Sequence, residues 1–307
     1  MTPRSIAVPL LEWFEHHGRS ALPWRTDRAP YRIVVSEFML QQTQVERVVP
    51  IFEAFVRAWP SFDALAAASQ ADVVRAWAGL GYNSRAIRLY RLATSVRDDF
   101  GGKLPQDEAT LRTLPGIGPY TARAIAAFAF ETDVVAVDTN IRRIVHRTQL
   151  GLEWPPRATA AAIDELASAL VPRGSGYAFN SALMDLGATL CSARAPKCLL
   201  CPLRATCAAA PIEPAALARA AVANAPQRTP QERLPFEATT RFVRGRVIDR
   251  LRALAPHEAI SLLELARELE PRLSAHYRQL PVFEAIVSGL ERDGVVERRD
   301  DRVRLGG

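Results

Sequence analysis

Residues 114–141 read LPGIGPYTARAIAAFAFETDVVAVDTNI, and this stretch decides the fold. It contains a Gly-x-Gly turn, Gly116 to Gly118, followed by a helical pattern in which Ile125 and Phe128 share a face. Backbone N–H groups at the start of such a helix bind anions, although an ordinary tight turn explains a Gly-x-Gly pattern equally well. Asp138 then precedes a second helical pattern, where we expect its carboxylate to cap the first free N–H groups.

A second Gly-x-Gly turn lies at Gly79-Leu80-Gly81, and it also joins two helical patterns. In both turns a hydroxyl side chain follows the second glycine by three residues, Ser84 in one and Thr121 in the other. Apolar residues at helical spacing recur through most of the chain. The one strand-like run in the first 240 residues, 134–137, is too short to build a sheet. The sequence therefore predicts a mostly helical protein.

The charge of the chain is compatible with a polyanionic partner. Lysine and arginine total 39 against 33 acidic residues, a formal net charge of +6. Lys103 and Lys197 are the only lysines, so cationic contacts depend on arginine, whose planar fork suits bidentate phosphate binding. A GC-rich coding bias explains the same scarcity equally well. In either case, a reaction that needs a lysine amine has only two candidates.

The composition is that of an ordinary globular protein, with 307 residues, 49% hydrophobic and 23% charged. This length predicts two or three compact units, and the composition excludes a disordered or collagen-like chain. No apolar run is long enough to span a bilayer, and the first ten residues lack the pattern of a signal peptide. We therefore expect a cytoplasmic protein with no membrane partner.

The four cysteines fall in one 17-residue window with the spacing C-x6-C-x2-C-x5-C: Cys191, Cys198, Cys201 and Cys207. Clustered thiols in a chain without an export signal indicate metal ligands rather than disulfides. Four such thiolates can hold a tetrahedral zinc or a cubane iron–sulfur cluster. The single C-x2-C pair with unequal flanking gaps favours the iron–sulfur cluster, because zinc ribbons usually bring two such pairs together.

The C-terminal part of the chain forms a separate pattern. Residues 208–240 are rich in Ala, Pro, Gln and Arg with poor periodicity, which predicts a linker. Beyond it, residues 242–254, 262–269 and 282–290 have helical patterns, and residues 295–305 form a hairpin pattern. Three helices closed by a hairpin are typical of a winged helix. Charges of both signs are mixed through it, so DNA contact and plain packing remain equally open.

Together these motifs resemble the helix-hairpin-helix DNA glycosylases of the endonuclease III superfamily. Within that superfamily, three further stretches look like the adenine DNA glycosylase branch, the MutY family: residues 22–25 (LPWR), 36–45 (SEFMLQQTQV) and 79–82 (GLGY). The resemblance covers roughly residues 5–210 in the right order. It departs from the family at Thr139 and Asn83, and the roughly 67 residues after Thr240 are too few for the Nudix-like domain that many members carry.

The resemblance implies an all-α, two-lobed fold that binds double-stranded DNA between its lobes as a monomer. Residues 1–27 and 134–208 would form an iron–sulfur cluster lobe, and residues 28–133 a six-helix barrel module with the helix-hairpin-helix. Residues 209–240 would be the linker, and residues 241–307 a small winged-helix-like domain. The four cysteines would hold a [4Fe–4S] cluster, and the hairpin a monovalent cation.

Glu37 is the expected general acid. It lies in a helical pattern among apolar residues, and burial in such surroundings raises the pKa of a carboxyl. The resemblance implies that Glu37 protonates N7 of a flipped adenine, which turns the base into a leaving group. An ion pair with Arg32 or Arg47 is the alternative.

Asp138 is the expected anion opposite the developing sugar cation, a role that the resemblance implies and that does not conflict with capping a helix. Asn140 would orient this site. Tyr120 stands where the lyases of the superfamily carry a Schiff-base lysine, so we expect a glycosylase without lyase activity in which Tyr120 assists Asp138. A packed aromatic with a locally bonded hydroxyl is the alternative for Tyr120.

The remaining expected site residues contact DNA. Gln42 and Tyr82 match positions that wedge into the duplex beside the flipped base, although a buried Tyr82 capping its glycine turn is an alternative. Arg25 matches a residue that lines the adenine pocket, and would otherwise be a surface or phosphate-binding arginine. We also expect contacts from the following four residues: Gln41, Gly116, Gly118 and Thr121.

The function that the resemblance implies is a base-excision-repair glycosylase that hydrolyses the glycosidic bond of adenine mispaired with 8-oxoguanine or guanine. One alternative is a mismatch glycosylase of the same fold that removes thymine or uracil opposite guanine, or a deaminated purine. Another alternative is a noncatalytic DNA-binding iron–sulfur protein.

Overall fold

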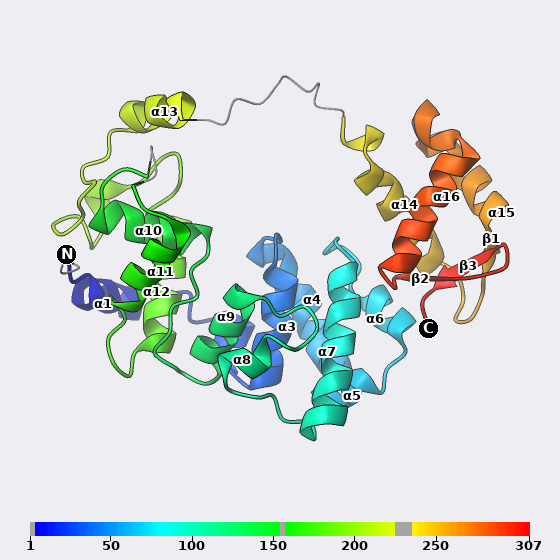
Figure 1. Ribbon diagram of the computed structural model, residues 1–307, viewed down its shortest axis with the longest axis horizontal. Coiled ribbons are helices and arrows are strands. Elements are labelled where there is room, and N and C mark those ends of the chain that lie inside the picture. Colours follow the sequence, from blue (N-terminus) through cyan, green and yellow to red (C-terminus); the bar gives the residue numbers. More distant parts are fainter. Residues whose placement is uncertain (1–3, 154–156, 225–234) are drawn as a thin grey trace. The chain divides into compact units, whose positions relative to one another are not determined.

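The computed structural model describes residues 4–153, 157–224 and 235–307 (Figure 1). The prediction of a mostly helical protein is confirmed. Contacts divide the chain into two compact units, one of residues 1–37, 105–113 and 117–228, the other of residues 38–104, 114–116 and 229–307. Over the described residues, no helix combines the length and apolarity needed to cross a membrane. The domain boundaries expected from the sequence stay a prediction.

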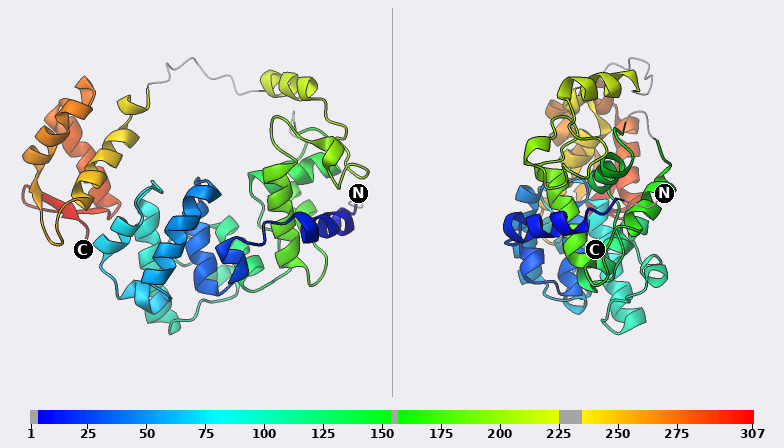
Figure 2. Two further views of the ribbon diagram at one scale, coloured as in Figure 1. Left: turned by 180° about the vertical axis from the view of Figure 1, so that it is seen from behind. Right: turned by 90° about the vertical axis from the view of Figure 1, so that its left-hand side faces the viewer.

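The first unit packs the N-terminal helix against helices from the second half of the chain. Figure 2 shows α1, in blue, lying against the green α12, and the two helices share a core that includes Leu10, Phe179 and Leu183. The elements of this unit are α1 (Ala7–His17), α2 (Pro23–Thr26), the first part of α3 (Pro30–Leu40), α8 (Glu108–Leu111), α9 (Pro119–Ala129), α10 (Thr139–Gln149), α11 (Ala160–Ser168), α12 (Gly176–Thr189), the 3₁₀ turn η1 (Cys198–Leu200) and α13 (Pro214–Ala223).

Helix α13 lies within residues 209–240, which the sequence analysis expects to be a linker. It begins with Pro214 at its first position, where a proline fits because its missing N–H has no partner in a helix. Alanine fills six of its ten positions and has the best helix propensity, although it gives little apolar periodicity to detect. Residues 225–234 of the expected linker lie outside the described residues.

The second unit begins with helices whose buried residues recur at helical spacing, as Val48, Phe52 and Phe55 do in α4. Its longest helix, α7, ends at Gly101, which adopts the left-handed conformation that closes many helices. Helices α5 and α7 pack closely together. The helices of this segment are α4 (Val45–Ala58), α5 (Phe62–Ala66), α6 (Gln70–Ala76) and α7 (Ser84–Phe100).

The C-terminal segment of the second unit has three main helices and a small antiparallel sheet of strand order β1-β3-β2. The expected winged-helix-like pattern is therefore confirmed, with β1 as a third strand that the sequence analysis does not predict. Strands β2 and β3 are joined by a two-residue turn, in which Asp300 has a positive φ of 54°. The elements are η2 (Phe236–Ala238), α14 (Thr240–Arg252), β1 (Ile260–Ser261), α15 (Leu262–Leu269), η3 (Glu270–Arg272), η4 (Ala275–Arg278), α16 (Leu280–Arg292), β2 (Val296–Arg299) and β3 (Arg302–Leu305).

This C-terminal segment shares its core with helices α6 and α7. Val74 and Ile87 belong to the same apolar cluster as Val247 and Leu290. The guanidinium of Arg252 on α14 donates to the backbone oxygen of Val74 at 2.9 and 3.1 Å. The second unit is thus built mainly from two stretches that are far apart in the sequence.

Candidate active site

Glu37 lies on the buried face of α3, and its side chain is almost fully enclosed. Removal from water and, to a smaller extent, the nearby Asp138 carboxylate together raise the pKa of its carboxyl to about 7, against a hydrogen bond from Tyr120 that lowers it. A large part of Glu37 therefore carries a proton at neutral pH. A general acid needs such a proton, and the role of Glu37 stays a prediction; Arg32, named above as an alternative partner, forms an ion pair with Asp27 at 3.3 Å.

Tyr120 lies in the first turn of α9, which begins with Pro119. Burial raises the pKa of its phenol well above the usual value, and the charges of Glu37 and Asp138 act in the same direction. The hydroxyl therefore keeps its proton and donates it in the hydrogen bond to Glu37. This hydrogen bond joins the expected general acid to the expected helper of Asp138.

Asp138 caps helix α10, as the sequence analysis expects. One of its oxygens accepts the N–H of Ile141 at 2.7 Å, and the other accepts the Asn140 side-chain amide at 3.1 Å. The extended segment before it is held by Asn180, which accepts the N–H of Ala136 at 2.9 Å and donates to the oxygen of Val134 at 2.7 Å. Asn180 is fully buried and was not identified from the sequence.

A chain of hydrogen bonds leads from Asp138 to the cysteine loop. Asn140, which donates to Asp138, accepts a hydrogen bond from Arg143 at 2.9 Å. Arg143 also donates to the backbone oxygens of Cys191 at 2.8 Å and Gly187 at 3.0 Å. Arg143 could not be identified from the sequence, because nothing in its local pattern separates it from the other arginines of α10.

Arg25 is held by a buried carboxylate. Its guanidinium forms a two-pronged ion pair with Asp185, at 2.6 and 3.1 Å, and lies over the ring of Phe14. Asp185 also accepts two hydrogen bonds from Arg19, and these contacts lower its pKa against the effect of burial. The structure therefore places Arg25 in a fixed and largely buried position, rather than on the open surface.

The two expected wedge residues, Gln42 and Tyr82, lie in loops of the second unit with strained backbones. Both have positive φ angles, 55° for Gln42 and 45° for Tyr82, which costs a non-glycine residue roughly 1 kcal/mol or more. Both side chains are exposed, Tyr82 to 42%, so the alternative of a buried Tyr82 is not what the structure has. Gln41 is half-buried.

Arg85 ties these two loops together. Its buried guanidinium donates to the backbone oxygens of Gln41 at 2.5 Å and Gly81 at 3.1 Å. It also bonds three further backbone oxygens and one hydroxyl, those of Phe38, Met39, Leu80 and Thr43. Burial lowers the pKa of Arg85 to about 10, so it stays charged at neutral pH. Arg85 could not be identified from the sequence, because its partners are mostly backbone atoms that leave no pattern there.

The predicted hairpin between α8 and α9 is present. Gly116 has a φ of 81°, and a Cβ atom there would lie 2.9 Å from the ring of Phe38, so only glycine fits. Gly118 precedes α9 in open space with an ordinary φ of −94°. Thr121 in α9 is only 5% exposed, and its expected contact with DNA stays a prediction.

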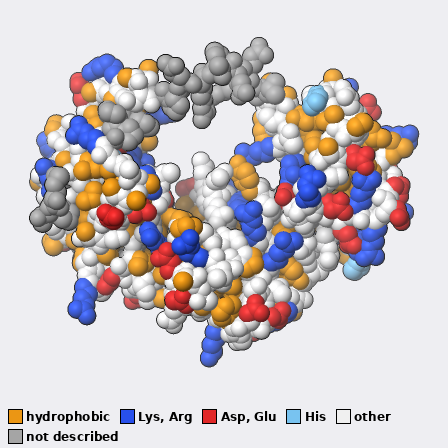
Figure 3. Space-filling model, viewed as in Figure 1, with side chains coloured by type: hydrophobic (Ala, Val, Ile, Leu, Met, Phe, Trp, Pro, Cys, Tyr) orange, Lys and Arg blue, Asp and Glu red, His pale blue; other side chains and the backbone are white. Residues whose placement is uncertain are grey.

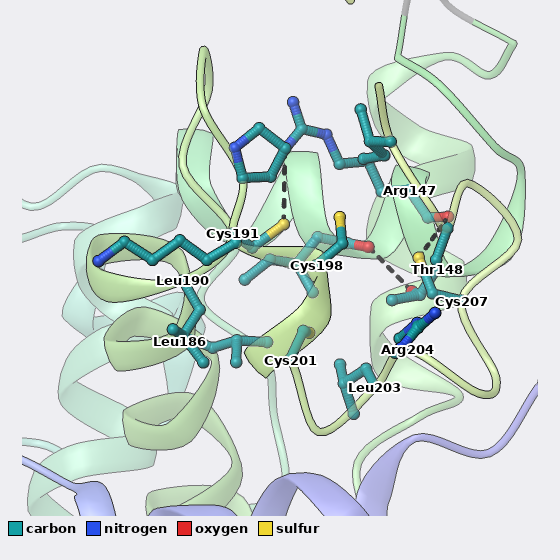
Figure 4. Close-up of a pocket in the computed structure, with 15 residues that line it drawn as sticks. Arg147, Thr148, Leu186, Leu190, Cys191, Cys198, Cys201, Leu203, Arg204 and Cys207 are labelled. Carbon is teal, nitrogen blue, oxygen red and sulfur yellow. Dashed lines mark hydrogen bonds between the residues drawn. The ribbon is translucent and has the colours of Figure 1, made fainter. Parts of the chain in front are cut away.

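The four cysteines line one cavity in the first unit, together with apolar side chains such as Leu186 and Leu203 (Figure 4). All four are free thiols, which agrees with ligands rather than disulfides. Burial raises the pKa of Cys201 to about 11, so without a cation nearby this thiol stays protonated. Over the residues that the structure describes, no group of three or more Cys, His, Asp or Glu is arranged around a single metal ion.

Arg147 on α10 braces the cysteine loop. Its fully buried guanidinium pairs with Glu153 and donates to the backbone oxygens of Ser192 at 2.8 Å and Ala193 at 3.1 Å. It also lies 3.6 Å from the sulfur of Cys191, while its own backbone oxygen accepts the thiol of Cys207 (Figure 4). The first and last cysteines are thus fixed by one residue.

Comparison with known proteins agrees with this geometry. The family model of the "HhH-GPD superfamily base excision DNA repair protein" matches residues 35–169. An adenine DNA glycosylase of Mycolicibacterium smegmatis is 44% identical over 247 residues, 80% of this chain and 80% of that protein. The structure of a thermostable thymine-DNA glycosylase is 30% identical, with a TM-score of 0.59, and covers 65% of this chain and 92% of that one. A non-covalent endonuclease III–DNA complex, 20% identical, has a TM-score of 0.56 over 64% and 90% of the two chains and shares the fold.

Proposed function

Because the chain belongs to the adenine DNA glycosylase family, within the helix-hairpin-helix superfamily of base-excision repair proteins, we propose that it hydrolyses the glycosidic bond of adenine in mispaired DNA. The observation that carries the proposal is the buried Glu37, which has a pKa of about 7 and is hydrogen-bonded to Tyr120. A carboxylic acid that is still partly protonated at neutral pH is what departure of a purine requires.

In the first step, the protonated Glu37 donates its proton to N7 of the adenine that has left the helical stack. The bond between the sugar C1′ and N9 then breaks, and its electron pair leaves with the base. Tyr120 orients Glu37 through their shared hydrogen bond.

In the second step, the sugar is left as an oxocarbenium cation, and Asp138 faces it with a negative charge. The hydrogen bonds from the Ile141 N–H and the Asn140 amide fix the two oxygens of Asp138. Asp138 either stabilises the cation electrostatically or forms a transient bond to C1′. Water then adds to C1′, and its proton passes to a carboxylate of the site, as in two-carboxylate glycoside hydrolysis.

DNA binding in this proposal uses residues of both units. Gln42 and Tyr82 wedge into the duplex, and their strained, exposed loops support this role because strain of this kind is common at functional positions. The backbone N–H groups after Gly116 would bind a phosphate together with a monovalent cation. Arg25, fixed by Asp185, would line the base pocket.

The four cysteines of the first unit would hold a [4Fe–4S] cluster. Their chemistry fits, because four free thiols surround one cavity with apolar walls. When bound, the cluster cross-links the loop and so contributes to its folding. Arg143 and Arg147 would hold this loop against α10. The proposal expects a broad absorbance near 400 nm and about four irons per chain in an anaerobic preparation, and stoichiometric zinc would contradict it.

The test is single-turnover cleavage, developed with alkali, on matched duplexes that carry A:8-oxoguanine, A:G, T:G, U:G or hypoxanthine:T. We expect cleavage at adenine opposite 8-oxoguanine and guanine. Borohydride should trap no protein–DNA adduct, because neither Lys103 nor Lys197 lies at the position of Tyr120. No release of adenine from any duplex would contradict the proposal.

A second candidate is a mismatch glycosylase that acts on pyrimidines. The 30% identity to a thymine-DNA glycosylase structure favours it. Glu37→Gln separates the two candidates, because a pyrimidine has no N7 to protonate. The substitution should abolish release of adenine, whereas a pyrimidine activity would survive it.

A further inference from the structure

A cavity of about 370 Å³ lies in the second unit, beside the expected wedge residue Tyr82. Tyr82, Asn83 and Ser84 line it from the start of α7, and Thr240, Arg241 and Arg244 line it from α14. Its floor is apolar, formed by residues such as Ile248 and Leu290. Figure 3 shows basic side chains gathered on the face where α14 and α16 meet the beginning of α7. The C-terminal segment thus supplies one wall of this cavity, beside Tyr82.

Arg241 lies directly over the ring of Tyr82, with its guanidinium carbon 4.4 Å from the ring centre. The same guanidinium carbon lies 6.0 Å from the centre of the Phe236 ring. A guanidinium stacked on an aromatic ring keeps its N–H donors free, because they point outward in its own plane. Within residues 4–153, 157–224 and 235–307, the structure gives Arg241 no carboxylate partner, and its side chain is exposed.

The neighbouring arginines of α14 are used for packing. Arg244 forms an ion pair with Asp293 of α16. Arg252 donates to the side-chain oxygen of Asn83 at 2.7 Å, in addition to its bonds with Val74. These contacts fix α14 against the wedge loop. Among the described residues, Arg241 therefore has aromatic contacts but no carboxylate partner.

We propose that Arg241, with the polar groups of Asn83 and Ser84, binds a backbone phosphate of the DNA beside the mispair, which makes the C-terminal segment part of the DNA-binding surface. The inference rests on the proposed function, because it requires Tyr82 to enter the duplex. Each strand carries a phosphate about every 3.4 Å along the helix axis. A free arginine stacked on an inserted side chain is therefore always within reach of one.

The experiment measures the dissociation constant of the full-length protein for a mispaired duplex over a range of salt concentrations. The duplex carries 2′-fluoroadenosine, which resists cleavage. Arg241→Gln should weaken binding about tenfold and reduce the slope of log affinity against log salt by about one. Arg241→Lys keeps the charge and should restore the slope, which separates phosphate binding from loss of the stacked ring contact. Arg267→Gln, at an exposed arginine of α15 away from the cavity, is the matched control and should change neither quantity.

A set of duplexes with one uncharged methylphosphonate at each position around the mispair locates the contact. At the phosphate that Arg241 binds, the methylphosphonate should lower the affinity of the unchanged protein but not that of Arg241→Gln, because both changes remove the same interaction. An unchanged affinity and salt slope in Arg241→Gln, or additive losses at every phosphate, would overturn the inference. A wild-type protein that binds with this salt signature but releases no adenine would overturn the proposed function alone.

Discussion

The carboxylate of Asp138 lies near the buried carboxyl of Glu37, and burial together with this negative charge raises the pKa of Glu37 to about 7. Glu37 is buried, and its proton is stabilised both by burial and by the neighbouring negative charge. Asp138 accepts hydrogen bonds from a backbone N–H and an amide, which hold its two oxygens in place. The geometry therefore supplies one proton donor, Glu37, beside a second carboxyl group that hydrogen bonds hold in a fixed position.

The pH dependence of the single-turnover rate should follow Glu37. Because the protonated form is the active one, the rate at saturating protein should fall as pH rises through about 7, tenfold for each further pH unit. The measurement is the rate of adenine release between pH 5 and 9, with DNA binding checked at each pH. A rate that is flat up to pH 9 would exclude Glu37 as the acid.

Glu37 should also destabilise the folded protein at neutral and alkaline pH. Its pKa is higher in the folded than in the unfolded chain, so folding becomes less favourable as pH rises from about 4.5 to 7, and then levels off. The cost is about 3 kcal/mol at pH 8, from a shift of about 2.5 units at 1.36 kcal/mol each. Glu37→Gln should therefore increase the free energy of unfolding in urea at pH 8 by about this amount, and change it little at pH 4. If Glu37→Gln and the unchanged protein had equal free energies of unfolding at pH 8 as well as at pH 4, the raised pKa of Glu37 would be contradicted.

Arg143 should act as a positioning residue for Asp138. Arg143→Met removes the donor that fixes Asn140, and a small misplacement of a reacting group lowers rates by roughly tenfold to a hundredfold. The shape of the pH profile should stay the same, because Glu37 is not altered. Arg142→Met changes the neighbouring arginine, which pairs with Asp164 at 3.5 Å, and should leave the rate within about twofold. Similar losses in both variants would indicate a general effect on α10.

Arg85 should hold both wedge loops. Arg85→Lys cannot reach the six acceptors of the guanidinium, so several buried backbone oxygens lose their partners and the free energy of unfolding should fall by about 3 kcal/mol. Arg91→Lys, at an exposed position of the same helix, should cost less than about 0.5 kcal/mol. Fluorescence of 2-aminopurine beside the mispair reports base flipping. It should show a weaker response for Arg85→Lys even at temperatures where that variant is fully folded.

The sequence predicts those site residues that carry a local pattern. Asp138 stands at the start of a helical pattern and Glu37 within an apolar one, so both their places and their electrostatic surroundings follow from near neighbours. Asp185 and Asn180 could not be found in this way, because each binds groups more than 40 residues away and looks locally like any polar helix residue. The fold shows the same division. The helices and the C-terminal hairpin follow from periodicity, whereas the packing of Val74 and Ile87 into the C-terminal core depends on contacts that no local pattern records.

The shared core of the second unit delays its folding while the protein is synthesised on the ribosome. Residues 38–104 emerge early, but the chain from 229 onward that completes their core is made only after the whole intervening segment of the first unit. At roughly 5–20 residues per second, that is a delay of about 6–25 seconds. During this time the apolar faces of α6 and α7 remain exposed to solvent, whereas most of the first unit can already fold. A nascent chain that stalls before residue 229 would therefore expose an apolar surface that lacks its packing partner. Incompletely folded chains of this kind are bound by chaperones.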